Sequence, residues 1–325
     1  MGEPVCSVVP KGIGRKGSLA YVKLLLIGGT QFVGRAVASE AMSRGHHVTV
    51  FHRGVSPASG LDGAVVIKGD RDSDLSALES GEWDATVDVC AYRPHQVDLV
   101  ADALGGRGGR HAFISTVSVY AGDIAPGGDE TSRFVDLDAL SGLDLATCEI
   151  TDAAYGPLKV LAEQRVHALY TDPLIIRPTY VLGPRDYTMR FPTWIQRIAD
   201  GGVVEVPLPS DVAFQYIDVA DQAQFIVDQL ERRTTGIFNT AAPSITFEQM
   251  INTVAAVVGG PDLELRWVDG ADSDAESGRY PLWSGTRSET VLQIDASAAF
   301  ALGLTCRPLA ETARETLDWL NSQPS

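Results

Sequence analysis

The sequence is poor in cysteine, in basic residues and in long apolar runs, and each shortage excludes a class of protein. Its four cysteines in 325 residues show no C-x-x-C or cysteine/histidine spacing, so neither a disulfide scaffold nor a zinc or redox motif is indicated. Lys and Arg number 26 against 42 Asp and Glu, and a net charge of −16 disfavours nucleic acid or an anionic membrane as the main partner. The apolar runs fall short of the roughly 20 residues of a membrane helix.

These shortages favour a cytosolic protein with reduced thiols, no metal site and no membrane span. The six histidines are not spaced as metal ligands. The first 20 residues lack the continuous apolar segment of a secretory signal, and we expect them to form a disordered leader. A chain of this length can bury a large core.

From Val22 to about Arg177 short apolar runs alternate with helical patterns, which is typical of parallel βαβ units. Strands are expected at VKLLLI, HVTVF, AVVIK, ATVDVC, RHAFIST and PLIIR, with helices beginning near Phe32, Ser73, His95 and Asp152. Nearly continuous apolar runs indicate strands covered by helices on both faces. The expected fold class is α/β, a Rossmann-type doubly wound parallel sheet with a smaller C-terminal α+β substrate-binding part.

The regular alternation ends after Pro178, where proline, glycine and aromatic residues become frequent. We divide the chain into a leader at 1–20, a dinucleotide-binding domain at 21–178, and a substrate-binding part at 179–212 and 241–325. The stretch 213–240 has the pattern of a strand running into a helix, and we expect it to return to the dinucleotide-binding domain. The acidic run from Asp269 to Tyr280 is expected to be an exposed loop.

The glycine-rich loop GGTQFVG follows the first expected strand and leads into a helix. Backbone amides of such a loop, together with the helix N-terminus, can face a pyrophosphate. The spacing is GGxxxxG and not the usual GxGxxG, so a tight strand-to-helix turn is the alternative. We expect a dinucleotide to contact the loop at Gly28, Gly29, Thr30, Gln31, Phe32, Val33 and Gly34.

The second strand ends in His52 and Arg53, without a carboxylate. An acidic residue there would bind the ribose 2′-hydroxyl, whereas a guanidinium suits a 2′-phosphate. We therefore expect NAD(P) as the cofactor, with NADP favoured over NAD and a solvated arginine as the alternative. Asp70 could reach the adenine amine or cap the next helix, and Cys90 and Ala91 would lie under a cofactor ribose.

Tyr155 and Lys159 are one helical turn apart in AAYGPLKVLAEQ and therefore share a helix face. Free tyrosine has a pKa of about 10, so a phenol acting as a base near neutrality needs a shift of about 3 units. A neighbouring ammonium lowers a phenol pKa in this way. Without other motifs, a tyrosine four residues before a lysine is also typical of the exposed face of an amphipathic helix.

With the glycine loop, FISTVSVY on the fifth strand and YGPLK on the following helix, the chain resembles the short-chain dehydrogenase/reductase superfamily, in its extended, epimerase/dehydratase-like branch and GGxxxxG subgroup. The resemblance implies that Thr116 holds the substrate oxygen and that Tyr155 is the general acid/base. It also implies that Lys159 lowers the tyrosine pKa and binds the nicotinamide ribose, while backbone at Pro178 meets the carboxamide.

Two positions depart from well-known members of that branch. Val117 and Ser118 follow Thr116 where dehydratases carry an acidic pair, so sugar dehydration is disfavoured. Gln215 stands where sugar-nucleotide enzymes often have a basic residue for the diphosphate, which puts a nucleotide-sugar substrate in doubt.

For two groups of residues the sequence allows both a binding role and a structural role. Three arginines are candidate anion binders or solvated surface residues: Arg177, Arg185 and Arg190. Five aromatic residues would wall a substrate cleft or belong to a core: Tyr187, Phe191, Trp194, Tyr280 and Trp283.

The expected function is an NAD(P)-dependent oxidoreductase or epimerase that moves a hydride at a hydroxyl/ketone carbon of a small molecule or sugar derivative. A dinucleotide-fold RNA-binding protein and a non-catalytic NAD(P)-sensing regulator are the alternatives. The expected partner is a small-molecule substrate, and a homodimer is left open.

Overall fold

The computed structural model describes residues 21–55, 58, 60–271, 278–285 and 290–323. The expected leader at 1–20 and most of the expected acidic loop lie outside the described residues. Within the described part of the chain, no helix is long and apolar enough to cross a membrane.

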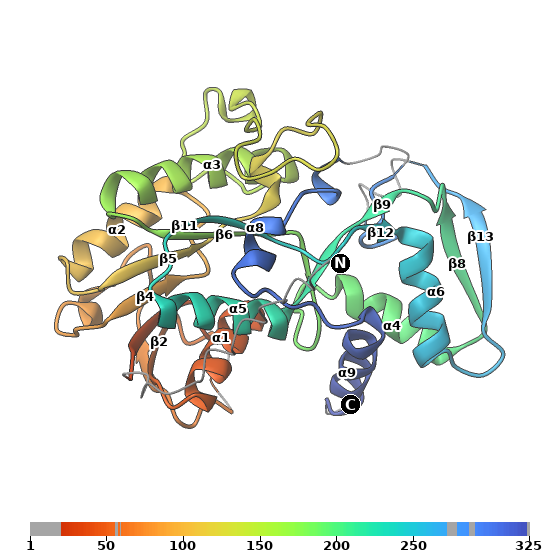
Figure 1. Ribbon diagram of the computed structural model, residues 1–325, viewed down its shortest axis with the longest axis horizontal. Helices are drawn as coiled ribbons and strands as arrows, with labels where there is room; N and C mark the ends of the chain where they lie inside the picture. Colours follow the sequence, from red (N-terminus) through yellow and green to blue (C-terminus); the bar gives the residue numbers. More distant parts are fainter. Residues whose placement is uncertain (1–20, 56–57, 59, 272–277, 286–289, 324–325) are drawn as a thin grey trace, which may run out of the picture.

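A seven-stranded parallel sheet lies at the centre of the molecule, in the order β11-β6-β5-β4-β1-β2-β3 (Figure 1). Its strands are β1 (Lys23–Ile27), β2 (His47–His52), β3 (Val65–Lys68), β4 (Ala85–Asp88), β5 (Arg110–Ile114), β6 (Leu174–Pro178) and β11 (Gly236–Thr240). In the register of β1, Leu25 pairs with Thr49 of β2 and with Thr86 of β4. The chain order reverses between β1 and β4, which is where open sheets of this kind bind ligands. The predicted doubly wound parallel sheet is confirmed.

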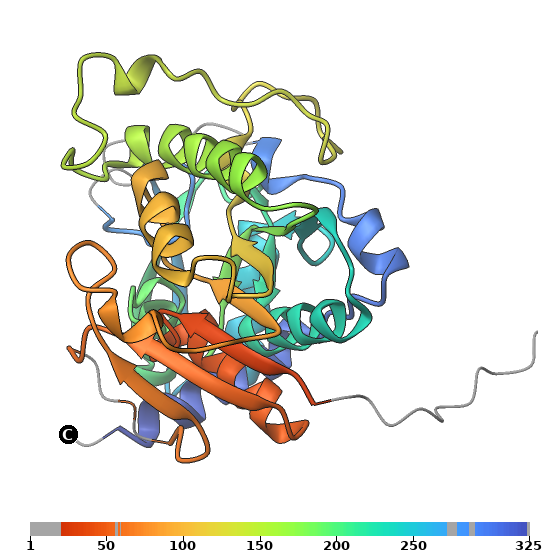
Figure 2. The ribbon, with the colours of Figure 1, turned by 90° about the vertical axis from the view of Figure 1, so that its left-hand side faces the viewer.

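Helices cover both faces of this sheet, which explains the continuous apolar strands. Helices α1 (Phe32–Ser43) and α5 (Val219–Arg232) lie on one face, and α2 (Pro94–Leu104) and α3 (Asp152–Leu169) lie side by side on the other (Figures 1 and 2). Along β1, Leu24 and Leu26 join the core under α1, whereas Leu25 and Ile27 join a separate cluster on the opposite face. All four side chains are at most 1% exposed, since alternate residues point to opposite, equally covered faces.

The helix expected near Ser73 is wrong, because this segment forms only a three-residue 3-10 turn at Ser76–Leu78. The aspartates of the segment explain the difference. Asp70 Oδ1 accepts a hydrogen bond from the amide of Asp72, and Asp74 Oδ1 accepts one from the amide of Ser76. Such local bonds offer the backbone an alternative to a helix.

The second part of the molecule has its own core. Its elements are β7 (Tyr180–Leu182), α4 (Arg190–Asp200), β8 (Val203–Leu208), β9 (Ala213–Phe214), β10 (Tyr216–Asp218), β12 (Ile245–Thr246), α6 (Phe247–Val258), β13 (Glu264–Asp269) and α9 (Leu309–Asn321). The short helix α8 (Ser297–Ala301) packs instead against β11 of the central sheet. Strand β13 pairs in parallel with β8, and α4, α6 and α9 pack together beside them. Four of the five candidate cleft aromatics are buried in this core, and only Tyr187 is not: Phe191, Trp194, Tyr280 and Trp283.

The chain returns to the central sheet after leaving it. Strand β9 pairs with β12 and β10 pairs with β7, both outside the main sheet. Helix α5 then packs against α1, and β11 adds to the edge of the sheet beside β6, with Phe238 opposite Ile176. Residues 219–240 therefore lie on the central sheet, while the preceding strands belong to the second part.

Candidate active site

A cavity of about 660 Å³ opens beyond the carboxyl ends of five strands, β2, β1, β4, β5 and β6. Arg53 follows β2 at one end of it, and Thr116 follows β5 further along. Three strand spacings separate β2 from β5, so the cavity runs roughly 14 Å along the sheet edge at ~4.8 Å a strand. An elongated ligand lying across the switch point fits this shape.

The glycine loop forms the floor of the cavity beside β4. Gly28 has φ +89°, and a Cβ added there would lie 2.7 Å from the Sγ atom of Cys90. Both the backbone conformation and the close approach of the two segments therefore require glycine. Gln31 caps α1 without a side-chain hydrogen bond to the helix, and the first residues of α1 line the cavity.

Most residues expected at the cofactor and catalytic sites line this one cavity, although they come from distant parts of the sequence. They are Gly28, Thr30, Gln31, Phe32, Val33, Gly34, His52, Arg53, Cys90, Thr116, Tyr155, Lys159 and Pro178.

Three expected cofactor residues do not line the cavity. Gly29 packs against the side chains of Leu26 and Val50, behind the loop. Asp70 uses its carboxylate locally, as described above for the turn after β3. Ala91 is fully buried and contributes its carbonyl oxygen, which accepts a hydrogen bond from Lys159. In this structure Gly29 therefore serves packing, Asp70 stabilises the turn after β3, and Ala91 helps to hold Lys159.

Helix α3 brings Tyr155 to the end of β5. Thr151 caps this helix by accepting a hydrogen bond from the amide of Ala154. Gly156 lets the helix approach closely, because a Cβ there would lie 2.2 Å from the carbonyl oxygen of Ser118. The Tyr155 side chain is consequently hydrogen-bonded to Thr116.

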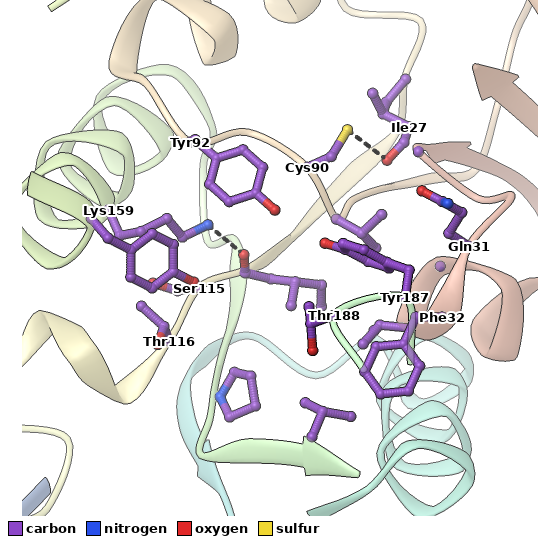
Figure 3. Close-up of a pocket in the computed structure, with 18 of the residues that line it drawn as sticks. Ile27, Gln31, Phe32, Cys90, Tyr92, Ser115, Thr116, Lys159, Tyr187 and Thr188 are labelled. Carbon is purple, nitrogen blue, oxygen red and sulfur yellow. Dashed lines mark hydrogen bonds between the residues drawn. The ribbon is translucent and has the colours of Figure 1, made fainter. Parts of the chain in front are cut away.

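Lys159 lies deeper than Tyr155 and is held by backbone carbonyls (Figure 3). Its ammonium donates to the carbonyl oxygens of Ala91 at 2.9 Å and Ile114 at 2.7 Å. It also lies 4.1 Å from the centre of the Phe113 ring. Because an ammonium has three donors and Lys159 lines the cavity, the third N–H is available to a ligand.

Burial dominates the titration of this pair. It raises the pKa of the Tyr155 phenol, opposed by the hydrogen bond with Thr116 and by the positive charge of Arg190. It also lowers the pKa of Lys159 to about 8. Desolvation therefore outweighs the charge effects on the pKa of Tyr155 at this site, and the acidification of the tyrosine by Lys159 stays a prediction.

Two residues beside the site were not anticipated from the sequence. Arg71 lines the cavity, with both terminal nitrogens 2.8 Å from the carboxylate oxygens of buried Asp88 and one of them 3.0 Å from Cys90 Sγ. This pairing holds the pKa of Asp88 below its usual value. Tyr92 also lines the cavity, with its ring centre 6.1 Å from that of Tyr155. No local motif marks Arg71 in the sequence, because its partner Asp88 is 17 residues away.

The three candidate anion-binding arginines lie in different surroundings. Arg177 is fully buried and forms a two-point ion pair with Glu163, at 2.6 and 2.9 Å. Arg185 does not line the cavity. Arg190 does, at the start of α4, where its Nε donates to Thr188 Oγ1 at 3.1 Å.

Four lining residues carry a buried polar atom without a hydrogen-bond partner. Among the described residues these atoms are His52 Nε2, Arg71 Nε, Ser115 Oγ and Thr179 Oγ1. Buried polar atoms are normally satisfied, so these four mark positions where a bound polar ligand would supply the missing partner. No aspartate or glutamate occurs among the described lining residues, although Arg53, Arg71, Lys159 and Arg190 do.

Comparison with known proteins gives two curated relatives. The chain is 26% identical over 269 residues to the 2-alkyl-3-oxoalkanoate reductase of Stenotrophomonas maltophilia, covering 75% of this chain and 78% of that protein. It is 25% identical over 276 residues to the chloroplast stem-loop binding protein of 41 kDa b of Arabidopsis thaliana, covering 79% and 68%. No family model matches the sequence.

Solved structures resemble the chain over nearly its whole length. One is the UDP-N-acetylglucosamine 4-epimerase of Methanobrevibacter ruminantium in complex with UDP-N-acetylmuramic acid, with a TM-score of 0.72, 18% identity, and 94% and 99% of the two chains covered. Another is the Bordetella bronchiseptica enzyme WbmG in complex with NAD and UDP, with a TM-score of 0.69, 18% identity, and 93% and 96% covered. At these identities the likeness establishes the fold, and the expected short-chain dehydrogenase/reductase, epimerase-like fold is confirmed. The GGxxxxG subgroup stays a prediction.

Proposed function

We propose that this protein is an NAD(P)-dependent oxidoreductase that reduces a ketone carbon of a small molecule, with Tyr155 as the proton donor. The observation that carries the proposal is the meeting of Thr116, Tyr155 and Lys159 at one end of a cavity whose other end holds the glycine loop. The likeness to a reductase and to epimerases adds support. An epimerase is the closest alternative.

A nicotinamide dinucleotide fits the residues present. The glycine loop lines the cavity, and the first turn of α1 would face the pyrophosphate. The unpartnered atoms of His52, Ser115 and Thr179 would find hydrogen-bond partners on such a ligand. Lys159 would hold the nicotinamide ribose with its remaining N–H. When bound, the reduced cofactor supplies the hydride.

The chain's own residues would handle the proton and the substrate oxygen. Thr116 would donate a hydrogen bond to that oxygen and fix its position next to the phenol of Tyr155. Because burial raises the pKa of Tyr155, the phenol stays protonated at neutral pH, as proton donation to a carbonyl oxygen requires. The carbonyl carbon gains the hydride and the oxygen gains the phenolic proton, giving an alcohol. Water then returns a proton to the tyrosine.

A substrate panel tests this function. Purified protein with NADPH or NADH is offered ketones, keto acids, keto sugars and UDP-sugars, while cofactor absorbance is followed and products are separated. We expect cofactor consumption matched by alcohol formation with a ketone-bearing compound. UDP-sugars are expected to be inert, because Gln215 is buried away from the cavity with its amide bonded to backbone at Ala242 and Ile294. Epimerised UDP-sugar without net cofactor consumption would contradict the reductase in favour of an epimerase.

The preference for NADP is tested at Arg53, an exposed residue at the cavity end beyond β2. We expect Arg53→Gln to weaken NADPH binding about tenfold or more, because a charge-assisted contact with the 2′-phosphate is lost. Binding of NADH, which lacks that phosphate, should change less than about twofold. Titration calorimetry with both cofactors gives the comparison. An equal change for the two cofactors would contradict a role in 2′-phosphate recognition.

RNA binding is the second candidate, and it has one supporting observation, the printed name of the stem-loop binding relative. The net charge of −16 opposes it, because phosphate contacts supply most of the affinity of proteins for nucleic acid. A non-catalytic sensor has no such support here, since the Thr116, Tyr155 and Lys159 set is present.

A further inference from the structure

The electrostatics of the cavity differ from those of the whole chain. The protein carries a net charge of −16, yet its described cavity-lining residues include four cationic side chains and no carboxylate. Two of the cations are already occupied. Arg71 is paired with Asp88, and Lys159 donates to two backbone carbonyls. Arg53 and Arg190 are the cations left near the two ends.

Arg190 occupies an unfavourable position for a cation. It is the first residue of α4, where the helix dipole is positive. The first turn of α4 contains no acidic residue, and within the described part of the chain no carboxylate lies at ion-pair distance from Arg190. Its contacts are the hydroxyl of Thr188 and the ring of Tyr180, 5.4 Å from the guanidinium carbon. A helix N-terminus and a guanidinium together favour an anion at this point.

The location of Arg190 assigns this anion to the substrate end of the cavity. Arg190 packs on Tyr180, which follows β6, the neighbour of β5 in the sheet, whereas Arg53 follows β2 at the other end. Tyr187 and Thr188, which precede Arg190, line the same cavity (Figure 3). The uncharged remainder of this wall includes Val117, Val291 and Leu292.

We propose that the substrate is a keto acid, whose carboxylate is bound by Arg190 while its ketone oxygen lies between Thr116 and Tyr155. This inference rests on the proposed function and deepens it by naming the substrate class. A planar guanidinium can bind a carboxylate through two parallel hydrogen bonds, which fixes the orientation of the substrate as well as its charge. The apolar wall would then contact the carbon chain.

Binding is measured first, in a state where no reaction can occur. The protein is saturated with NADP⁺, which cannot reduce a ketone, and is titrated with pyruvate, acetoacetate and levulinate and with their methyl esters. Each ester keeps the carbon skeleton and removes the charge. We expect at least one acid to bind about 10- to 100-fold more tightly than its ester, as for a charge-assisted contact. Because the three acids differ in the number of carbons between carboxylate and ketone, the acid with this preference shows which spacing the site accepts.

Matched variants assign this preference to one side chain. Arg190→Gln should bring the acid-to-ester ratio close to one, and Arg190→Lys should retain part of it, because a lysine cannot make the two-point contact. Arg197→Gln is the control. Arg197 lies on the same helix, outside this cavity, and removing it makes the same change in net charge. It should leave the ratio within about twofold of the original.

The outcomes separate this proposal from the proposed function. A ratio near one for all three pairs, or a ratio that survives Arg190→Gln, overturns the carboxylate site. If Arg190→Gln lowers the affinity for NADP⁺ and leaves the acid-to-ester ratio unchanged, the carboxylate site is also overturned, because the guanidinium then binds the cofactor. A ratio that depends on Arg190 in a protein that never oxidises NADPH supports the carboxylate site and contradicts the reductase.

Discussion

Replacing Tyr155 by phenylalanine is expected to lower the turnover number about a thousandfold while leaving cofactor affinity within about twofold. The substitution removes only the hydroxyl next to Thr116, which we propose as the proton donor. General acid catalysis by a positioned side chain contributes roughly 10²- to 10⁴-fold, so its complete loss should have an effect of this size. Steady-state rates with the substrate from the panel, together with calorimetric binding of NADPH, provide the measurement.

Tyr170→Phe is the matched control for this variant. Tyr170 follows the same helix, α3, and its buried hydroxyl has no hydrogen-bond partner among the described residues. It stacks on His111 and does not line the cavity. Its loss of a hydroxyl should therefore change turnover less than about twofold. Turnover in Tyr155→Phe comparable with that of the Tyr170 control would refute proton transfer by Tyr155.

The second large effect is expected on stability, at the buried pair Arg177 and Glu163. Arg177→Met should lower the free energy of unfolding by about 3 to 5 kcal/mol, because it leaves a buried carboxylate without its partner. Both side chains are at most 2% exposed, so water screens the interaction little. Arg177 also donates to the hydroxyl of Tyr120, which in turn donates to Asn239 on β11. Urea unfolding at neutral pH, followed by circular dichroism, measures the change.

A double variant distinguishes an unpaired charge from general damage to the core. In Arg177→Met combined with Glu163→Leu both charges are replaced by apolar groups, and most of the lost stability should return. Glu163 lies four residues after Lys159 and eight after Tyr155 on α3, so the pair also fixes the helix that carries the site. A double variant no more stable than Arg177→Met would show that the packing around Arg177, and not the unpaired carboxylate, governs the loss.

The local patterns of the sequence were sufficient for most of the fold between residues 21 and 178. Buried strands and the glycine loop are determined by residues that are neighbours in the chain, so both can be predicted from the sequence. The turn after β3 could not be, because aspartate side chains compete with the backbone there. For the return of β11 to the sheet edge, the sequence offered only the strand-to-helix pattern within residues 213–240.

Site residues that belong to a sequence motif could be predicted. Residues whose surroundings depend on tertiary contacts could not. Thr116, Tyr155 and Lys159 stand in recognisable motifs, and all three line the cavity. The sequence could not show that Arg177, in β6, is fully buried against Glu163 while Arg190, at the start of α4, lines the cavity, because both outcomes depend on tertiary contacts. Nor could it indicate that burial raises the pKa of Tyr155, since desolvation depends on the whole surrounding structure.

The position of β11 limits how such a protein can be divided or recombined. Cutting the chain after Pro178 would remove β11 and α5 together, exposing the backbone edge of β6 and the apolar surface that α5 covers beside α1. Exposed edges of this kind invite pairing with other chains. The part that carries Arg190 therefore cannot be exchanged as a terminal module. New substrate pockets would have to be grafted as two segments, one inserted between β6 and α5 and one following β11.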